Sequence, residues 1–347
     1  MIKYIGSKRT LIPTICSIVE ALPEVTSCID LFSGTSRVGH ALKGKGFQVF
    51  SNDLNTYAAT IARCYVQANL EDWDKKAAKI IAHCNQIKPE EGYFTETFCK
   101  QALFFQPKNG AKVDAIREWI ETQDFEPELK AIILISLMEA ADRVDSTTGV
   151  QMAYLKSWAP RAHNDLKMKM PDILPQAKHG KSKAFQMDAF QASKVLKADL
   201  AYLDPPYNQH KYLGNYHIWE SLVRWDKPEF YGIAKKRIDV KDRKSPFNSK
   251  PRATAEMASV IKNLDARYLV VSFSDEGYIS RDEMVKVLSE RGHVHVINKD
   301  YKRYVGAQIG IHSTDGRKVG SVSHLSNTEY IFIVAKEKAD LERVKHG

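Results

Sequence analysis

The sequence has few cysteines and no cysteine pair at the spacing of a metal site. It contains five, an odd number, and none belongs to a C-x-x-C motif. All of them lie in the first third of the chain, mostly among apolar neighbours. We therefore expect no disulfide framework and no metal site, and instead buried thiols in a reducing cytoplasm.

Membrane-spanning and targeting segments are also missing. No window reaches the uninterrupted apolar length of a bilayer-spanning helix. The N-terminus lacks the basic region and apolar core of a secretory signal. The longest apolar run, residues 131–141, contains Glu139 and is short enough to be a core helix. We expect a cytoplasmic protein that does not associate with membranes.

The sequence does have the composition of a globular protein, with an excess of positive charge. Its 347 residues, 44% hydrophobic and 27% charged, are enough for one α/β domain with a smaller lobe. The formal net charge of +9 suits a polyanionic partner such as nucleic acid. A modest positive excess also occurs in proteins without such a partner, so charge alone leaves both possibilities open.

Strand and helix patterns alternate at both ends of the chain. A short apolar strand over residues 26–32 is followed by a glycine-containing turn, a helix over 37–43, a second strand over 47–51 and a helix over 56–69. This order predicts the opening of a doubly wound α/β sheet. The alternation resumes later, where we expect strands over 184–188, 199–204 and 267–274 and an antiparallel pair over 293–301 and 328–335.

Residues between these two regions show helical patterns and no strand alternation. Helices are indicated over 73–86, 111–122 and 127–144, and a polar, basic run follows over 161–183. We therefore expect a helical insertion within an α/β domain. The predicted boundaries are 1–88 and 181–347 for the α/β domain and 89–180 for the insertion.

The most informative stretch is the apolar strand that ends in Asp204-Pro205-Pro206-Tyr207. Two consecutive prolines have no amide hydrogen to donate, so the strand must stop there. Carbonyl oxygens then stand next to one carboxylate and one aromatic ring. This set of groups suits a planar base that carries an exocyclic amine. A strand that ends in a proline-rich turn is often only a turn, so the motif alone leaves both interpretations open.

Three further features suggest a nucleoside-type cofactor. Gly34, in the first strand-to-helix turn, lets the backbone approach a ligand closely. Within this turn only Gly34 precedes Gly39, which departs from G-x-G-x-x-G and disfavours a dehydrogenase. Asp53 ends the second strand, where an acid either binds ribose hydroxyls or caps the next helix. Lys8 follows a Gly-Ser bend and could reach a cofactor carboxylate or be a surface cation.

A basic segment covers residues 235–252. It holds eight lysines and arginines against Asp239 and Asp242, with two prolines and few apolar residues. We expect a mobile loop that contacts substrate phosphates at the carboxyl edge of the sheet. The alternative is an ordinary solvated charged loop.

Together, these motifs resemble a known enzyme family. Lys3–Lys8, Asp30–Thr35, Asn52-Asp53 and Asp204–Tyr207, in this order, resemble the Dam-like alpha group of DNA adenine-N6 methyltransferases. Asn208, Tyr212 and Asn215-Tyr216-His217 look like the branch found in restriction-modification systems, and Ser272–Gly277 and Asn327–Tyr330 look like later family segments. The resemblance covers nearly the whole sheet-forming portion and skips the insertion. It implies a Rossmann-like S-adenosylmethionine-dependent methyltransferase fold in which the insertion is the target-recognition region.

The resemblance and the residue types assign roles. The catalytic residues are Asp204, Pro205, Pro206 and Tyr207, and Tyr212 or Tyr216 either helps to hold the base or only packs. The cofactor-binding residues are Tyr4, Lys8, Phe32, Gly34, Asp53, Asp188 and Asp204. The DNA contacts are His210, Lys211, Lys235, Lys236, Arg237, Lys241, Arg243, Lys244, Lys250 and Arg252.

The expected function is methyl transfer from S-adenosylmethionine to N6 of a flipped adenine within a specific DNA sequence. We expect a monomer or weak dimer and a cognate restriction endonuclease that acts separately. One alternative is an N4-cytosine enzyme, which more often has serine at the position of Asp204, or an RNA enzyme, which often has asparagine there. Another is a DNA-binding subunit that has lost catalysis.

Overall fold

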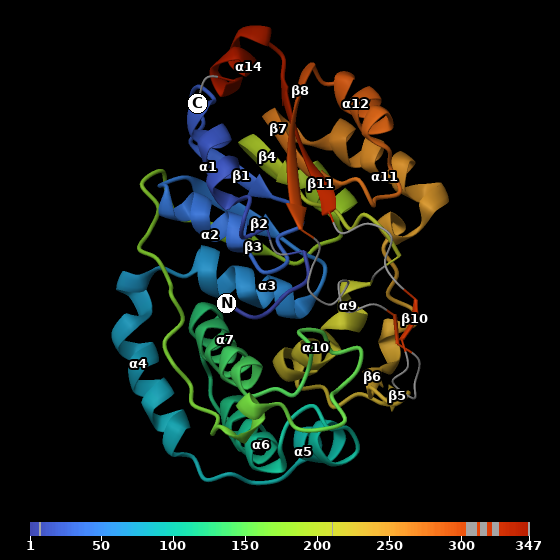
Figure 1. Cartoon of the computed structure of the whole chain (residues 1–347). Helices are drawn as coiled ribbons and strands as arrows, with labels where there is room; N and C mark the ends of the chain where they lie inside the picture. Colours follow the sequence, from blue (N-terminus) through green and yellow to red (C-terminus); the bar gives the residue numbers. More distant parts are fainter. Residues whose placement is uncertain (7, 210, 303–310, 313–317, 321–325, 346–347) are drawn as a thin grey trace.

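Seven strands form the central sheet of the computed structural model, which describes residues 1–6, 8–209, 211–302, 311–312, 318–320 and 326–345. Their order is β3-β2-β1-β4-β7-β11-β8 (Figure 1). The first five are parallel, and β11 runs antiparallel to both of its neighbours. Their bounds are β1 Ser27–Asp30, β2 Gln48–Asn52, β3 Lys183–Phe185, β4 Lys197–Leu203, β7 Asp265–Ser274, β8 His293–Lys302 and β11 Ser326–Ala335. The predicted α/β fold with a closing antiparallel pair is confirmed.

Helices cover both faces of the sheet. On one face, α1 (Ile12–Ala21), α2 (Arg37–Gly44) and α14 (Lys338–Lys345) share a core with alternate strand residues such as Cys28, Val49 and Leu200. On the other face, α8 (Ala189–Val195), α11 (Lys250–Asn263) and α12 (Arg281–Ser289) pack on Ile29, Ala201 and Leu269. Strands buried on both faces read as continuous apolar runs, which is why the sequence revealed them. The helix α1 was not anticipated.

The order of the sheet reverses at β1. The chain passes from β1 to β2 and β3 on one side, then returns to β4 on the other side of β1. The carboxyl ends of β1 and β4 therefore flank a topological switch point, where open α/β sheets bind ligands. Strand β4 is buried from Leu200 to Leu203 and ends directly before Asp204, as two following prolines require.

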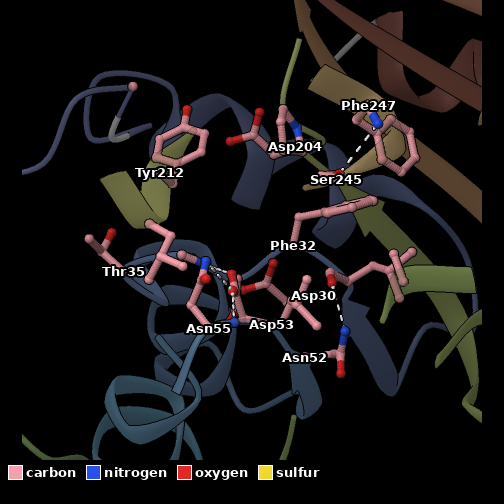
Figure 2. A pocket seen from close by; sticks show the side chains of 18 of the residues that line it. Asp30, Phe32, Thr35, Asn52, Asp53, Asn55, Asp204, Tyr212, Ser245 and Phe247 are labelled. Carbon is pink, nitrogen blue, oxygen red and sulfur yellow. Dashed lines mark hydrogen bonds between the residues drawn. The ribbon is translucent and has the colours of Figure 1, made fainter. Parts of the chain in front are cut away.

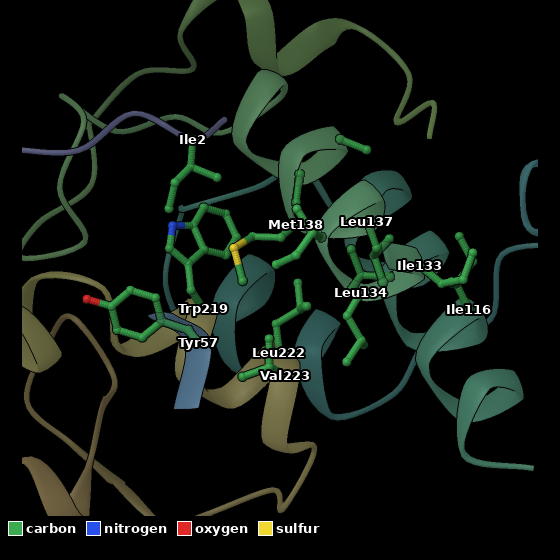
Figure 3. Packing of buried hydrophobic residues seen from close by; sticks show 14 of the residues in the cluster. Ile2, Tyr57, Ile116, Ile133, Leu134, Leu137, Met138, Trp219, Leu222 and Val223 are labelled. Carbon is green, nitrogen blue, oxygen red and sulfur yellow. The ribbon is translucent and has the colours of Figure 1, made fainter. Parts of the chain in front are cut away.

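A helical lobe, residues 70–180, packs below the sheet in Figure 1. It contains α4 (Leu70–Gln86), α5 (Tyr93–Thr95), the π-helical turn η2 (Glu96–Lys100), α6 (Pro107–Glu121), α7 (Pro127–Arg143) and the short 3-10 turn η3 (Pro160–His163). Its core includes residues from outside the lobe, among them Ile2, Tyr57 and Trp219, which meet Met138 of α7 (Figure 3). The helical lobe thus begins with α4, upstream of residue 89, where the sequence patterns placed the start of the insertion. Helix α3 (Thr56–Ala62), its π-helical continuation η1 (Arg63–Gln67) and α10 (His217–Arg224) join the lobe to the sheet.

The basic segment 235–252 is built into the fold. It contains β6 (Lys236–Arg237), which pairs with β5 (Phe230–Tyr231), then the short turns η4 (Ile238–Val240) and η5 (Pro246–Asn248), and it ends within the first turn of α11. Val240 and Phe247 are buried. The prediction of an unpacked mobile loop is therefore wrong, because these two apolar side chains anchor it. The remaining short elements are α9 (Tyr212–Asn215), β9 (Ile311–His312) and β10 (Lys318–Gly320).

Candidate active site

A deep pocket opens at the carboxyl ends of β1, β2 and β4. Figure 2 shows Asp204 and Tyr212 facing Asp30, Asp53 and Asn55 across it. The empty space between its walls, open mouth included, is about 1140 Å³. All seven predicted cofactor residues line this pocket: Tyr4, Lys8, Phe32, Gly34, Asp53, Asp188 and Asp204.

The turn after β1 is held against the acid after β2. The Gly34 amide donates to Asp53 Oδ2 at 2.9 Å, and the Asn55 amide donates to Asp53 Oδ1 at 2.9 Å. Burial raises the pKa of Asp53 above its ordinary range, while the amide bonds from Asn55 and Gly34 oppose that rise. Gly34 has φ +51°, a conformation that favours glycine, and an added Cβ would lie 3.6 Å from the Tyr4 ring. The turn therefore leaves its backbone open to a ligand.

Stacked tyrosines form one wall of the pocket. The Tyr4 ring lies between Tyr212, at a centroid distance of 5.4 Å, and Tyr216, at 4.4 Å, nearly parallel to both. The Tyr4 hydroxyl is hydrogen-bonded to Tyr57 Oη at 3.1 Å. Tyr216 Oη accepts from the Ile5 amide at 2.6 Å, so Tyr216 fixes the N-terminal segment. Tyr4 and Tyr212 line the pocket, whereas Tyr216 packs behind them.

Lys8 lies between two carboxylates. Its Nζ is 3.1 Å from Asp204 Oδ1 and also forms an ion pair with Glu329 of β11. Lys8 and Glu329 are buried, and the Asp204 side chain is 21% exposed. Burial raises the pKa of Asp204 to about 6, with Glu329 adding to the rise and Lys8 opposing it. The two carboxylates raise the pKa of Lys8 well above its ordinary value despite its burial, which keeps it cationic. The pocket thus holds an ionisable acid clamped by a fixed cation.

The other members of the Pro-Pro motif lie close by. Pro206 lines the pocket with Asp204, whereas Pro205 is buried beneath it. The half-buried Tyr207 ring makes an edge contact with Phe273 at a centroid distance of 6.2 Å, and its carbonyl accepts from the Tyr278 amide at 2.8 Å. Tyr207 stands beside the pocket wall rather than in it.

Several polar groups around the cofactor turn have no partner in the described part of the protein. The buried hydroxyl oxygens of Ser33, Ser36 and Ser51 lack a hydrogen bond there. Asp30, at the end of β1, accepts from the Gly39 amide at 3.2 Å. Burial and the nearby Asp204 raise the pKa of Asp30 to about 7. Of these three serines, only Ser33 lines the pocket. Its unsatisfied hydroxyl beside the glycine turn fits a polar ligand such as S-adenosylmethionine, whose amino-acid and ribose groups need hydrogen-bond partners.

The predicted DNA contacts divide into buried and exposed groups. Arg237 is 2% exposed and forms ion pairs with Asp226 at 2.7 Å and Asp239 at 3.1 Å. Its assignment as a DNA contact is wrong, because the guanidinium is held inside the fold. Arg243 lines the pocket and donates to Glu220 at 2.8 Å. Lys241, Lys244, Lys250 and Arg252 are exposed, Lys235 and Lys236 are half-buried, Lys211 lines the pocket, and His210 lies outside the described residues.

Comparison with known proteins identifies the family. Residues 4–287 match the family model of D12 class N6 adenine-specific DNA methyltransferases. The chain belongs to this family. The modification methylase StsI of Streptococcus sanguinis is 30% identical over 326 residues, covering 88% of this chain and 49% of its own length. The type II methyltransferase M.NlaIII of Neisseria lactamica is 29% identical, with 96% and 99% covered, and M.FokI of Planomicrobium okeanokoites is 28% identical, with 99% and 54% covered.

The chain therefore spans about half the length of StsI and M.FokI and nearly all of M.NlaIII. The family match confirms the resemblance expected from the sequence motifs. In this D12 methyltransferase, the described residues contain no cluster of three or more potential metal ligands. All five cysteines are buried and unbridged. Across the described ranges, no helix is long and apolar enough to cross a bilayer.

Sequence reasoning missed some pocket residues of this methyltransferase. Phe247 of the basic segment meets the Phe32 ring edge-on at 5.2 Å and lines the pocket. Asp30, Asn52 and Met187 also line it. Asp30 opens the quoted motif of the first turn, so its place at the end of β1 was a usable signal. Phe247 sits alone in a charged run, and no local pattern marks it.

Proposed function

We propose that this protein transfers the methyl group of S-adenosylmethionine to N6 of adenine in DNA. The observation that carries the proposal is the Asp204 carboxylate, which the Pro-Pro turn holds in the same pocket as the Gly34–Asp53 cofactor turn. When bound, S-adenosylmethionine supplies an activated methyl group on its sulfonium. Gly34, Asp53 and the unpartnered hydroxyl of Ser33 are the groups available to hold it.

Asp204 would accept a hydrogen bond from the adenine amine. The amine nitrogen is a poor nucleophile, because its lone pair is delocalised into the ring. A carboxylate and a prolyl carbonyl that accept its two N–H groups favour a pyramidal nitrogen and free the lone pair. With a pKa of about 6, Asp204 is ionised at neutral pH and can accept. Lys8 keeps the carboxylate charged and fixed, so most of the rate gain comes from positioning and electrostatics.

The adenine must leave the duplex to reach this pocket. A base inside a helix cannot bring its amine to a recessed carboxylate, so enzymes of this kind extrude the target nucleotide. Tyr212, which lines the pocket, and Tyr207, which stands beside its wall, both follow Asp204 in the chain and are the candidate surfaces for stacking. Lys211, which lines the pocket, is the candidate contact for the flanking phosphate.

DNA would bind across the mouth of the pocket. Four cations of the basic segment remain exposed: Lys241, Lys244, Lys250 and Arg252. They supply sequence-independent phosphate contacts. The inserted region, residues 89–180, is the candidate target-recognition region. We further propose that the protein acts in the cytoplasm as a monomer or weak dimer, apart from any cognate restriction endonuclease.

The aspartate favours adenine over cytosine as the target. A test uses purified protein, S-adenosylmethionine with a labelled methyl group, and duplex DNA or RNA, followed by digestion and mass spectrometry of the nucleosides. The proposal predicts labelled N6-methyldeoxyadenosine. Label in N4-methyldeoxycytidine, label only in RNA, or no transfer to nucleic acid would each overturn it.

A further inference from the structure

Helix α3 begins at Thr56, three residues after Asp53, yet the side chain of its N-cap residue does not cap it. Asn55 is a favoured N-cap type. Its side-chain amide instead donates to Asp53 Oδ1 at 3.3 Å and makes no capping bond. The first amides of a helix have no partner within the helix and need one elsewhere.

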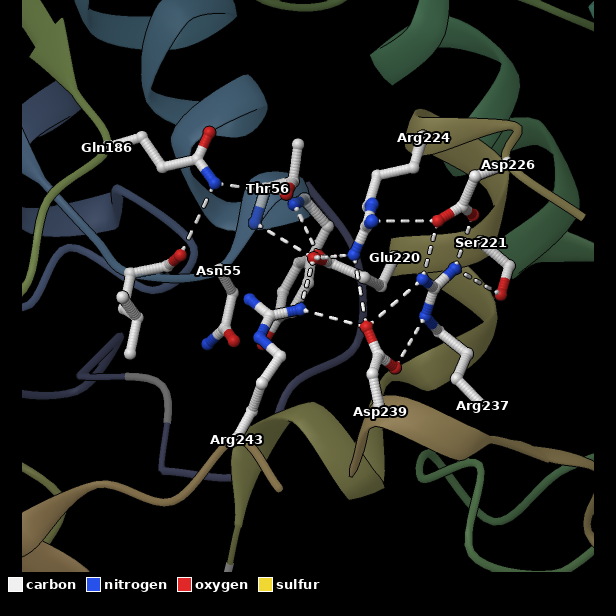
Figure 4. Close-up of polar contacts among 12 residues, drawn as sticks. Asn55, Thr56, Gln186, Glu220, Ser221, Arg224, Asp226, Arg237, Asp239 and Arg243 are labelled. Carbon is white, nitrogen blue, oxygen red and sulfur yellow. Dashed lines mark hydrogen bonds and ion pairs between the residues drawn. The ribbon is translucent and has the colours of Figure 1, made fainter. Parts of the chain in front are cut away.

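Glu220 of α10 supplies the missing cap from 164 positions away. Its Oε1 accepts from the Thr56 amide at 3.3 Å, and its Oε2 accepts from the Tyr57 amide at 3.0 Å (Figure 4). The side chain is fully buried. A negative charge at a helix N-terminus is favoured both by these hydrogen bonds and by the helix dipole.

The buried charge of Glu220 is balanced from the basic segment. Arg243 Nη1 lies 2.8 Å from Glu220 Oε1, and Arg224 lies 3.9 Å from the same oxygen. Asp239 in turn binds both arginines. Figure 4 shows these groups as one connected network that runs from α10 through the basic segment to the start of α3. A buried carboxylate with such partners holds a fixed position.

The start of α3 holds two groups of the cofactor pocket. Asp53 accepts a hydrogen bond at 2.9 Å from the backbone amide of Asn55, the residue immediately before the helix. The backbone amide of Tyr57 donates to Glu220, and the Tyr57 hydroxyl is hydrogen-bonded to the Tyr4 hydroxyl at 3.1 Å. Any shift of the helix start would move both the acid and the aromatic wall.

We infer that Glu220 is a positioning residue: by capping α3, it holds Asp53 and Tyr4 in place for S-adenosylmethionine. This inference rests on the proposed function. It also assigns Arg243 a role apart from phosphate contact, as the partner that neutralises Glu220.

The test replaces Glu220 by Gln in the full chain and measures S-adenosylhomocysteine binding by calorimetry. The glutamine side chain keeps one oxygen that can accept a hydrogen bond, but its NH2 group then faces donors: the backbone amides of α3 and the guanidinium of Arg243. Because hydrogen bonds to charged groups are the strong ones, we expect affinity to fall about tenfold or more. In methyl transfer, KM for S-adenosylmethionine should rise while kcat at saturation is kept.

Asp114→Asn is the matched control. Asp114 is also a buried carboxylate, and it accepts from the Gly92, Phe94 and Thr95 amides at 2.8–2.9 Å at the start of α5, within the helical lobe. The Asp114→Asn variant should have a lower melting temperature, as Glu220→Gln should, but its affinity for S-adenosylhomocysteine should be unchanged. Equal affinity losses in both variants, or wild-type affinity in Glu220→Gln, would overturn the inference.

A second pair of variants tests the same inference if Glu220→Gln does not fold. Thr56 is the first residue of α3, where proline is tolerated, and the extended backbone of Asn55 suits a following proline. Thr56→Pro removes the amide hydrogen that Glu220 accepts, and Thr56→Ala keeps it. Weaker binding by Thr56→Pro than by Thr56→Ala supports the inference, and equal binding contradicts it. If the wild type itself does not bind S-adenosylhomocysteine, it is the proposed function that fails.

Discussion

Lys8 should set the pH at which the methyltransferase becomes active. Its Nζ is 3.1 Å from Asp204 Oδ1, and the pKa of Asp204 is about 6. An opposite charge at this distance lowers a carboxyl pKa by about 1 to 3 pH units. Lys8→Met should therefore raise the pKa of Asp204 to between about 7 and 9. At pH 7 the ionised fraction of Asp204 is about nine-tenths in the wild type. In Lys8→Met it would be about one half if the pKa rises to about 7, and about one hundredth if it rises to about 9.

The assay is the methyl-transfer rate at saturating DNA and S-adenosylmethionine across pH 5.5 to 9. Because a protonated carboxyl is a weaker hydrogen-bond acceptor than a carboxylate and carries no charge to stabilise the developing positive nitrogen, the rate should rise with pH through the pKa of Asp204. Lys8→Met should move this acid limb to higher pH. Glu329→Gln should move it to lower pH, because Glu329 raises the pKa of Asp204.

Lys3→Met is the control for this series. Lys3 is a cation of the same N-terminal segment, but it bonds to Asp145 at 2.8 Å and does not line the pocket. Its removal should leave the acid limb in place. The reasoning is refuted if Lys8→Met loses rate equally at every pH, since Lys8 would then act on the cofactor rather than on Asp204.

Three other predictions concern stability and DNA binding. The pKa of Asp30 is about 7 in the folded protein, against about 3.9 in an unfolded chain, so the buried charge destabilises the fold above pH 7 and not below pH 4. Asp30→Asn should therefore gain unfolding free energy over the wild type progressively from pH 4 to pH 7, reaching about 2 to 4 kcal/mol in denaturant titrations; a pH-independent difference would contradict this. Arg237→Met should destabilise the fold by about 2 kcal/mol, because Asp226 and Asp239 lose their buried partner and are left with Arg224 and Arg243, and an unchanged melting temperature would show that the ion pairs of Arg237 contribute nothing. Lys241→Ala and Lys244→Ala should each lower the slope of log affinity for DNA against log salt by about 1 while melting normally; an unchanged slope in both would remove the basic segment from the DNA contacts.

Local chemistry made much of the fold and part of the site predictable. Strands buried on both faces appear as apolar runs, and a strand that meets two prolines has to end, which located Asp204. The Gly34 turn and Asp53 follow from the same logic, because the carboxyl ends of neighbouring parallel strands meet at one edge. These residues lie where they do because of their immediate neighbours in the sequence.

Contacts between distant segments were not predictable in this way. Lys8 meets Asp204 and Glu329 only because β4 and β11 lie on either side of β7 in the sheet. The cap that Glu220 provides depends on how α10 docks against α3. In the basic segment, composition predicted a loop, whereas the buried side chain of Phe247 and the ion pairs of Arg237 fix its path.

The most direct measurement maps modified bases in DNA from cells that express either the wild-type chain or Asp204→Ala. Asp204→Ala should still bind S-adenosylhomocysteine, so loss of the mark would report on the carboxylate. The account predicts N6-methyladenine within one sequence context for the wild type and none for Asp204→Ala. A modified cytosine, or the same adenine mark in both strains, would contradict it.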